Sequence, residues 1–157
     1  MNYMSIIEVD TVNGKGIRTS LFVAGCSFAC EGCFNKESWN YKAGKEFDEV
    51  AEKRVFDNLS QSWCAGLSIL GGDPLAEKNF ETVLRLAKKT KDIGKTVWLW
   101  TGYTIEEIRN NHASEILDVV DVLIDGRYIK SKHTTSNPWI GSTNQRVLKL
   151  DNLASLV

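Results

Sequence analysis

The stretch Leu21-Phe-Val-Ala-Gly25-Cys26-Ser-Phe-Ala-Cys30-Glu-Gly-Cys33 places three of the four cysteines of this 157-residue chain within eight residues, directly after a short apolar run. Four-iron clusters are normally held by four cysteine thiolates. A site with only three thiolates leaves one iron open, and an open position is typical of metal sites that carry out chemistry. The spacing therefore predicts an iron–sulfur site with Cys26, Cys30 and Cys33 as the metal ligands.

Two other kinds of site also use cysteines at short spacing, and both stay open at this point. A zinc site would need Cys64, His112 or His133 as a further ligand, although the paired ligand spacing of zinc modules is missing. A disulfide or redox site would suit an oxidising compartment, but no basic and apolar signal segment precedes the motif. We expect Cys64 to be a buried or semi-buried thiol without a redox role.

The composition limits both the fold and the partners. A chain of 157 residues with 43% hydrophobic content suits one domain, residues 1–157, with its own core. With 19 basic and 20 acidic residues and a net charge of -1, nothing favours nucleic-acid binding. The longest apolar runs are strand-length, far short of a membrane span. We expect a cytoplasmic protein with no nucleic-acid or membrane partner.

Apolar runs rich in branched and aromatic residues alternate with helical patterns, which predicts βα units and a mainly parallel sheet. The expected strands are residues 17–23, 67–70, 96–100 and 119–124. The expected helices are residues 48–61 and 79–91, with Asn79 as an N-cap of the second. A capping box at Thr104–Glu107 and a short turn capped by Ser114 should follow. Residues 125–129 and 146–150 are expected to be extended.

Each expected core strand ends in a polar or glycine-rich motif. These motifs are the cysteine triplet, Gly71-Gly-Asp-Pro74, Thr101-Gly-Tyr103 and Asp125-Gly-Arg-Tyr128. The carboxyl ends of parallel strands share one edge of a sheet, where α/β proteins assemble their active sites. Taken alone, the second motif is a common turn and Asp125-Gly126 a common hairpin. Their shared position predicts that the four motifs meet at one site.

The cysteine triplet after a first strand, with Gly71-Gly-Asp-Pro74 after the second, resembles the radical S-adenosylmethionine superfamily. Further segments resemble, more narrowly, the activating proteins of anaerobic (class III) ribonucleotide reductases. They are Val12-Asn-Gly-Lys-Gly-Ile-Arg18, Cys30-Glu-Gly-Cys-Phe-Asn35, Trp98-Leu-Trp-Thr-Gly-Tyr103 and Gly141-Ser-Thr-Asn-Gln145. The likeness runs from about residue 2 to residue 150. Lys15 stands where related activases commonly have proline, a change that concerns only a turn.

The resemblance implies a glycyl-radical activase with a 4Fe-4S cluster that cleaves S-adenosylmethionine reductively to a 5'-deoxyadenosyl radical. This radical would take the α-hydrogen of a glycine in the anaerobic ribonucleoside-triphosphate reductase. The fold implied is a partial (β/α) barrel, open on one side, because a full barrel needs about 250 residues. A reduced flavodoxin-like electron donor and a homodimer or heterotetramer are also implied. No catalytic side chain is expected beyond the cluster and cofactor.

The resemblance also assigns residues to S-adenosylmethionine. Gly71 and Gly72 would let backbone carbonyls approach the methionine ammonium, with Asp73 as a further acceptor. Arg127 would pair with the methionine carboxylate, because its planar guanidinium suits bidentate binding.

The remaining residues assigned to this cofactor contribute surface. They are Phe34, packed near the adenine, and Thr101 and Asp125, lining the floor of the site. Trp98 and Trp100 are expected to form barrel wall.

Two competing functions remain open. A radical S-adenosylmethionine enzyme acting on a small molecule would need a closed polar pocket with charged residues beyond those already assigned. A non-catalytic zinc-binding interaction module would recruit Cys64 and leave Asp73 and Arg127 without a role. The pair Asn144-Gln145 either stabilises a terminal strand or meets a partner protein.

Overall fold

In the computed structural model, which describes residues 1–28, 30–33 and 38–150, the described part of the chain forms a seven-stranded mixed sheet. The strand order is β3-β1-β2-β4-β5-β6-β7. The bounds are β1 Asn2–Asp10, β2 Arg18–Val23, β3 Lys45–Glu46, β4 Gly66–Gly71, β5 Thr96–Trp100, β6 Val122–Asp125 and β7 Arg146–Lys149. Strands β2, β4, β5 and β6 are parallel, and β1, β3 and β7 run antiparallel to their neighbours. The carboxyl ends of the four central strands therefore share one edge.

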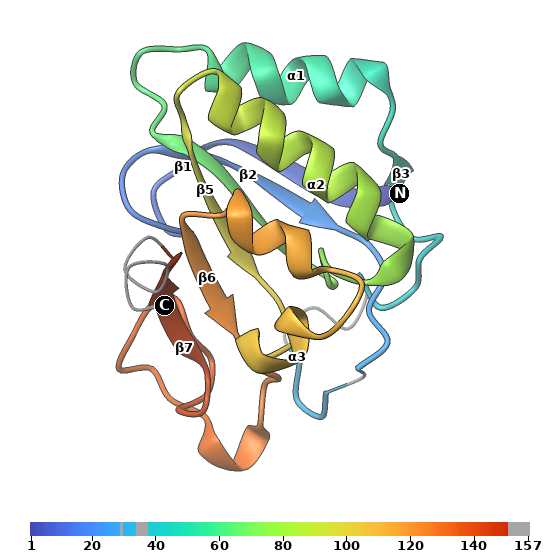
Figure 1. The fold of residues 1–157 in the computed structure, drawn as a ribbon, viewed down its shortest axis with the longest axis vertical. Coiled ribbons are helices and arrows are strands. Elements are labelled where there is room, and N and C mark those ends of the chain that lie inside the picture. The colour runs from blue at the N-terminus through green and yellow to red at the C-terminus, as the bar shows by residue number, and fades with distance from the viewer. Residues whose placement is uncertain (29, 34–37, 151–157) are drawn as a thin grey trace.

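Two long helices lie side by side on one face of this sheet (Figure 1). They are α1 Glu49–Leu59 and α2 Glu77–Asp92. The N-terminus of α1 is capped by Asp48, whose Oδ1 accepts from the Ala51 amide at 2.9 Å. Glu52 of α1 pairs with Arg85 and Lys89 of α2 at 2.6 and 2.9 Å, so the two helices are joined across their exposed sides.

Shorter helical turns connect the last strands. They are α3 Ile105–Arg109 and the 3-10 turns η2 Ser114–Asp118 and η3 Lys130–Lys132. The predicted capping box is confirmed, because the Glu107 amide donates to Thr104 Oγ1 and the Thr104 amide donates to Glu107 Oε1. No helix in the described ranges is both long and apolar enough to cross a membrane.

The main core lies between the sheet and the helices. Alternate strand residues point into it and are fully buried: Leu21, Val23, Leu67, Ile69, Val97, Leu99 and Leu123. Helix α1 contributes Val55 and Leu59, and helix α2 contributes Val83 and Leu86. This burial positions the strands, and with them the turns at their carboxyl ends.

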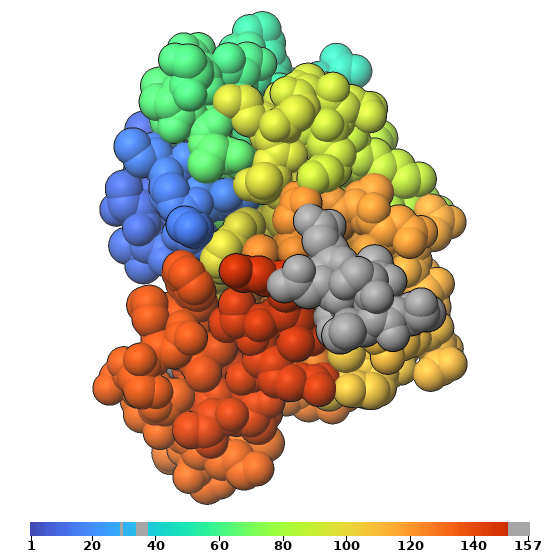
Figure 2. All heavy atoms as spheres, turned by 60° about the vertical axis from the view of Figure 1, so that its left-hand side comes forward, coloured from blue at the N-terminus to red at the C-terminus, as the bar shows by residue number. Residues whose placement is uncertain are grey.

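A second, aromatic cluster covers the opposite face of β5 and β6. Trp98, Val122 and Ile124 are buried there against Trp100 and Trp139. The segment that contributes Trp139, residues 127–150, forms a continuous lobe in the lower part of Figure 2. Trp98 is thus part of the wall, as predicted, whereas Trp100 also reaches the cavity described below.

The predicted α/β fold with a parallel centre is confirmed, and strands 17–23, 67–70 and 96–100 correspond to β2, β4 and β5. Strand β1 was not predicted. Its register shifts between Tyr3 and Ser5 and again between Ile7 and Asp10, and such bulges break the alternation that marks a strand in sequence. Pairing with β2 maintains the strand despite them.

Three local predictions are wrong. The strand expected at 119–124 begins only at Val122, because the amides of Val119 and Val120 still bond to the carbonyl of Ile116. Ser114 opens η2 without capping it. Helix α2 begins at Glu77, so Asn79 lies inside it and is not its cap.

Candidate functional site

The structure brings the four carboxyl-end motifs together around one cavity of about 200 Å³. The predicted site residues that line it are Cys26, Cys30, Cys33, Gly71, Gly72, Asp73, Thr101 and Arg127. They come from the loop after β2 that carries the three cysteines, residues 26–33, and from the turns after β4, β5 and β6. We call residues 26–33 the cysteine loop. Phe34 lies outside the described residues, and Asp125 is absent from this lining.

The turn after β4 is bonded to the start of the cysteine loop. The Gly72 amide donates to the Val23 carbonyl at 2.8 Å, and the Asp73 amide donates to the Gly25 carbonyl at 2.7 Å. A Cβ on Gly72 would lie 2.5 Å from that Gly25 oxygen, so only glycine permits this approach. The glycine at position 72 thus joins the turn after β4 to the start of the cysteine loop without any ligand.

Asn79 also links the turn after β4 to the segment before the cysteine loop, a role that the sequence did not reveal. Its buried side-chain amide donates to the carbonyls of Ala24 and Asp73 at 2.9 and 3.0 Å. In sequence Asn79 has the appearance of a helix cap, and only the fold brings the residue 55 positions earlier to its amide.

Asp73 organises the neighbouring turn. Its carboxylate accepts from the Thr101 hydroxyl at 2.8 Å, the Gly102 amide at 2.9 Å and the Leu75 amide at 2.9 Å. Burial raises the pKa of Asp73 to about 6, against the opposing effect of these three donors. Both carboxylate oxygens are therefore engaged within the protein, and Thr101 is positioned by the same bond.

Arg127 is another residue that lines the cavity. Its Nη1 and Nη2 donate to the two carboxylate oxygens of Glu107 at 3.4 and 3.2 Å. Its guanidinium lies 4.4 Å from the ring centroid of Phe28, in the cysteine loop. Two of its five N–H donors are thus used by one carboxylate, and among the described residues no side chain or carbonyl is bonded to the other three.

Asp125 does not line the floor of the cavity, contrary to the sequence-based expectation. Its carboxylate is 1% exposed and pairs with Arg146 of β7 at 2.5 Å. It also accepts from the amide of Ile105, at the start of α3. A buried carboxylate needs such partners, and here they fasten α3 and β7 to the end of β6.

The turn that carries Arg127 is held by two side-chain amides. Asn144 donates to the Arg127 carbonyl at 2.8 Å, and Gln145 donates to the Gly126 carbonyl at 3.0 Å. Both side chains thus support a turn at the cavity, which differs from the terminal strand expected from the sequence. The segment 141–145 stood out in sequence, but its partner could not be read from it.

Cys30 contacts this turn. Burial raises the pKa of its thiol, and the neighbouring Cys33 raises it further. The Tyr128 backbone amide bonds to the sulfur, and Arg127 lies close enough to favour the thiolate; both act in the opposite direction. An amide and a cation directed at a sulfur suit a thiolate that is to bear negative charge.

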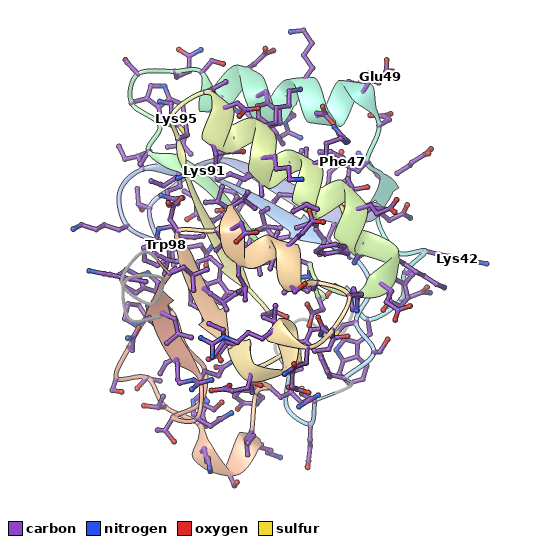
Figure 3. All side chains as sticks on the ribbon, viewed as in Figure 1. Lys42, Phe47, Glu49, Lys91, Lys95 and Trp98 are labelled. Carbon is purple, nitrogen blue, oxygen red and sulfur yellow. The ribbon has the colours of Figure 1, made fainter. Side chains whose placement is uncertain are left out.

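Cys64 lies at the other edge of the sheet, just before β4. It is 2% exposed, as predicted, and its carbonyl accepts from Lys95 at 2.7 Å. Figure 3 shows Lys95 where α2 ends and β5 begins, while Lys42, which follows the cysteine loop, lies at the opposite side. Because β2 and β4 are parallel, Cys64 cannot join the triplet as a fourth ligand. A zinc site built on these four cysteines is therefore contradicted.

The donor set fits a four-iron cluster. Three thiols line one cavity, and glycines without side chains border it. Within the described ranges, no three His, Cys, Asp or Glu side chains converge as ligands of a single metal ion. A four-iron cluster does not require such convergence, because its cysteines bind different irons.

Comparisons with known proteins agree with this chemistry. A protein family described as a 4Fe-4S single cluster domain matches residues 12–148. The chain is similar to proteins from Haemophilus influenzae (40% identity; 92% of this chain and 96% of the relative), bacteriophage T4 (44%; 94% and 93%) and Escherichia coli K12 (37%; 94% and 97%). All three relatives are named anaerobic ribonucleoside-triphosphate reductase-activating protein.

Proposed function

The chain belongs to the family of anaerobic ribonucleoside-triphosphate reductase-activating proteins, and from this premise we propose that it is a glycyl-radical activase. Its protein substrate is an anaerobic ribonucleoside-triphosphate reductase, in which it oxidises one glycine to a stable radical. The observation that carries this proposal is the meeting of the cysteine triplet with the three other carboxyl-end motifs at one cavity.

The cofactors proposed are a 4Fe-4S cluster, held by Cys26, Cys30 and Cys33, and S-adenosylmethionine. When bound, they supply a one-electron cleavage of the sulfonium to methionine and a 5'-deoxyadenosyl radical, which takes the glycine α-hydrogen. The protein's own part is to hold the cofactor and exclude competing reactions.

Cofactor positioning is assigned to the backbone of Gly71 and Gly72 and to the unused donors of Arg127. Gly71 has a φ of 108°, a conformation open mainly to glycine, and this conformation makes the end of β4 a bare backbone surface beside the thiols. Asp73 and Thr101 act by holding the turns after β4 and β5 in place. Phe34 stays assigned to the adenine.

The fold proposed is a partial (β/α) barrel of the radical S-adenosylmethionine type, in which residues 1–157 act as a single domain. Its parallel centre, with both faces of β5 and β6 covered, supports this assignment. The open side would admit the glycine-bearing segment of the reductase. A reduced flavodoxin-like donor, a cytoplasmic location and a homodimer or a heterotetramer with the reductase complete the proposal.

The test is anaerobic reconstitution with iron and sulfide, followed by dithionite and S-adenosylmethionine, with 5'-deoxyadenosine as the product measured. We expect the wild-type chain and Cys64→Ala to form the product, and Cys30→Ala to form none. Cys64→Ala is the matched control because it removes a thiol from the opposite edge of the sheet. Product formed equally by Cys30→Ala would refute the assigned ligand set.

Addition of the reductase then separates the activase from a small-molecule enzyme. A glycyl radical, detected by electron paramagnetic resonance, should appear only when the reductase is present. Formation of 5'-deoxyadenosine without any radical on the reductase would instead support an enzyme that acts on a small molecule.

A further inference from the structure

The cysteine loop carries an aromatic side chain that the proposed function does not use. Phe28 lies between Cys26 and Cys30 in sequence. It lines the cavity of about 200 Å³ beside the cysteines and also a second cavity, of about 360 Å³, at the start of α2. The ring thus borders both cavities, and the contacts that hold it help to position the cysteine loop.

Three neighbours hold the ring of Phe28. The Arg127 guanidinium lies over it at 4.4 Å, and Tyr103 meets it edge-to-face at 4.9 Å. Gly102 lets the ring reach the backbone, because a Cβ there would lie 2.5 Å from the ring. These contacts come from the turns after β5 and β6, so they join the cysteine loop to both.

Arg127 is itself fixed in this position. Its guanidinium is bonded to Glu107, and its carbonyl is bonded to Asn144. Glu107 is in turn held by the capping box with Thr104 at the start of α3. The ring therefore packs against a group whose own place is set by α3 and by the segment before β7.

We propose that Phe28 is the positioning residue of the cysteine loop, and that Arg127, Gly102 and Tyr103 form a clamp on its ring that orders the loop before iron and sulfide enter. The proposal rests on the proposed function only for the identity of the cluster, since the clamp belongs to the metal-free chain. An ordered loop loses less conformational freedom when a cluster binds, so clamping favours loading.

The test compares Phe28→Leu with Phe28→Tyr. Leucine stays apolar and leaves every charge in place but removes the ring, whereas tyrosine keeps the ring and is the matched control. In the reduced, metal-free full chain, alkylation of each cysteine by iodoacetamide is followed by mass spectrometry under argon. A faster reaction reports a thiol that is more accessible and less desolvated, and both changes follow when the loop is released from its contacts.

We expect alkylation of Cys30 relative to Cys64 to rise about tenfold in Phe28→Leu, the factor given by losing one aromatic pair and one cation–π contact. Phe28→Tyr should stay within about twofold of the wild type, because its ring keeps both contacts. After reconstitution, Phe28→Leu should also bind iron more slowly than Phe28→Tyr.

A second variant changes the backbone position that the Phe28 ring contacts. Gly102→Ala should displace the ring of Phe28 and raise the rate of Cys30 alkylation. The double variant Phe28→Leu/Gly102→Ala should react only a little faster at Cys30 than Phe28→Leu alone, because both changes disrupt the same contact. Wild-type rates in both single variants would overturn the clamp. A rise at Cys64 equal to that at Cys30 would also overturn it, since the ring would then stabilise the whole fold.

The two proposals fail separately. A wild-type chain that forms no 5'-deoxyadenosine refutes the activase but leaves the alkylation comparison valid. An active wild-type chain with unchanged thiol access in both variants refutes the clamp alone.

Discussion

Two arginines at opposite edges of one sheet have opposite environments. Arg18, at the start of β2, is 1% exposed, and Arg127, after β6, has a side chain 44% exposed. The five N–H donors of Arg18 are all used, by Ser68, Thr96, Lys15 and Leu67. Arg127 gives two donors to Glu107 and borders a cavity.

The difference shows where the molecule has room for chemistry. Burial lowers the pKa of Arg18 to about 10, and its bonds to backbone carbonyls and hydroxyls take the place of water. We call that edge the sealed edge, because all five N–H donors of Arg18 are satisfied within the protein. The carboxyl edge keeps unused donors, thiols and an open volume, which are what a cofactor requires.

The largest effect should come from breaking the sealed edge. Arg18→Met leaves several buried carbonyls and hydroxyls without donors, and we expect the free energy of unfolding to fall by about 3 to 5 kcal/mol. Arg127→Met should cost less than about 1 kcal/mol, because its ion pair with Glu107 is largely exposed. Urea denaturation of both variants measures this, and equal losses would contradict the contrast.

Two buried carboxylates extend the comparison to pH. Burial raises the pKa of Asp73 to about 6, so its ionisation opposes folding as the pH rises from about 4 through 6. Relative to Asp73→Asn, the wild type should lose at most about 3 kcal/mol over that window. Urea denaturation at several pH values measures the difference, and a flat difference would contradict the assignment.

Asp10, near the sealed edge, should respond in the opposite sense. Burial alone would raise its pKa, but bonds from Ser20, Val12 and Asn13 together lower it. A lowered pKa stabilises the fold above pH 4, and this contribution is lost as the pH falls below that value. Asp10→Asn should therefore remove part of the acid sensitivity that the wild type shows below pH 4.

A smaller loss of stability is expected when a side chain is added where the backbones of Gly72 and Gly25 meet, at the carboxyl ends of the strands. Gly72→Ala forces the turn away from Gly25, and we expect a loss of about 2 kcal/mol together with slower iron loading. Gly94→Ala is the control, since no atom lies within 4 Å of its Cβ and only its φ of 78° is unfavourable. Iron loading of Gly94→Ala should equal that of the wild type.

The smallest effect should come from the exposed rim of the same edge. The hydrogen bond from Arg146 lowers the pKa of Glu106 to about 2, so the pair stabilises the fold above pH 4.5 and loses this effect toward pH 2. Because Glu106 is 60% exposed, Glu106→Gln should cost less than about 0.5 kcal/mol at neutral pH. In 1 M salt that difference should vanish, and a larger one would show that the rim is not solvent-screened.

The predictions that succeeded concern neighbours in sequence. The parallel strands and the capping box of Thr104 and Glu107 each depend on spacings of a few residues. Strand β1 was missed because its bulges hide the alternation, and strand β6 was placed too early because Val119 and Val120 still close the preceding turn.

By itself, the sequence determined which groups stand at the strand ends, three thiols and a glycine pair, because these depend on residue type and local order. Only the tertiary structure decided how other groups are used: Asp125 is turned to Arg146, Asn79 bonds to Ala24, and Arg127 packs on Phe28. The reason is physical. A buried polar group or a half-buried ring is assigned its role by partners tens of residues away, and those partners are chosen by the packing of the sheet.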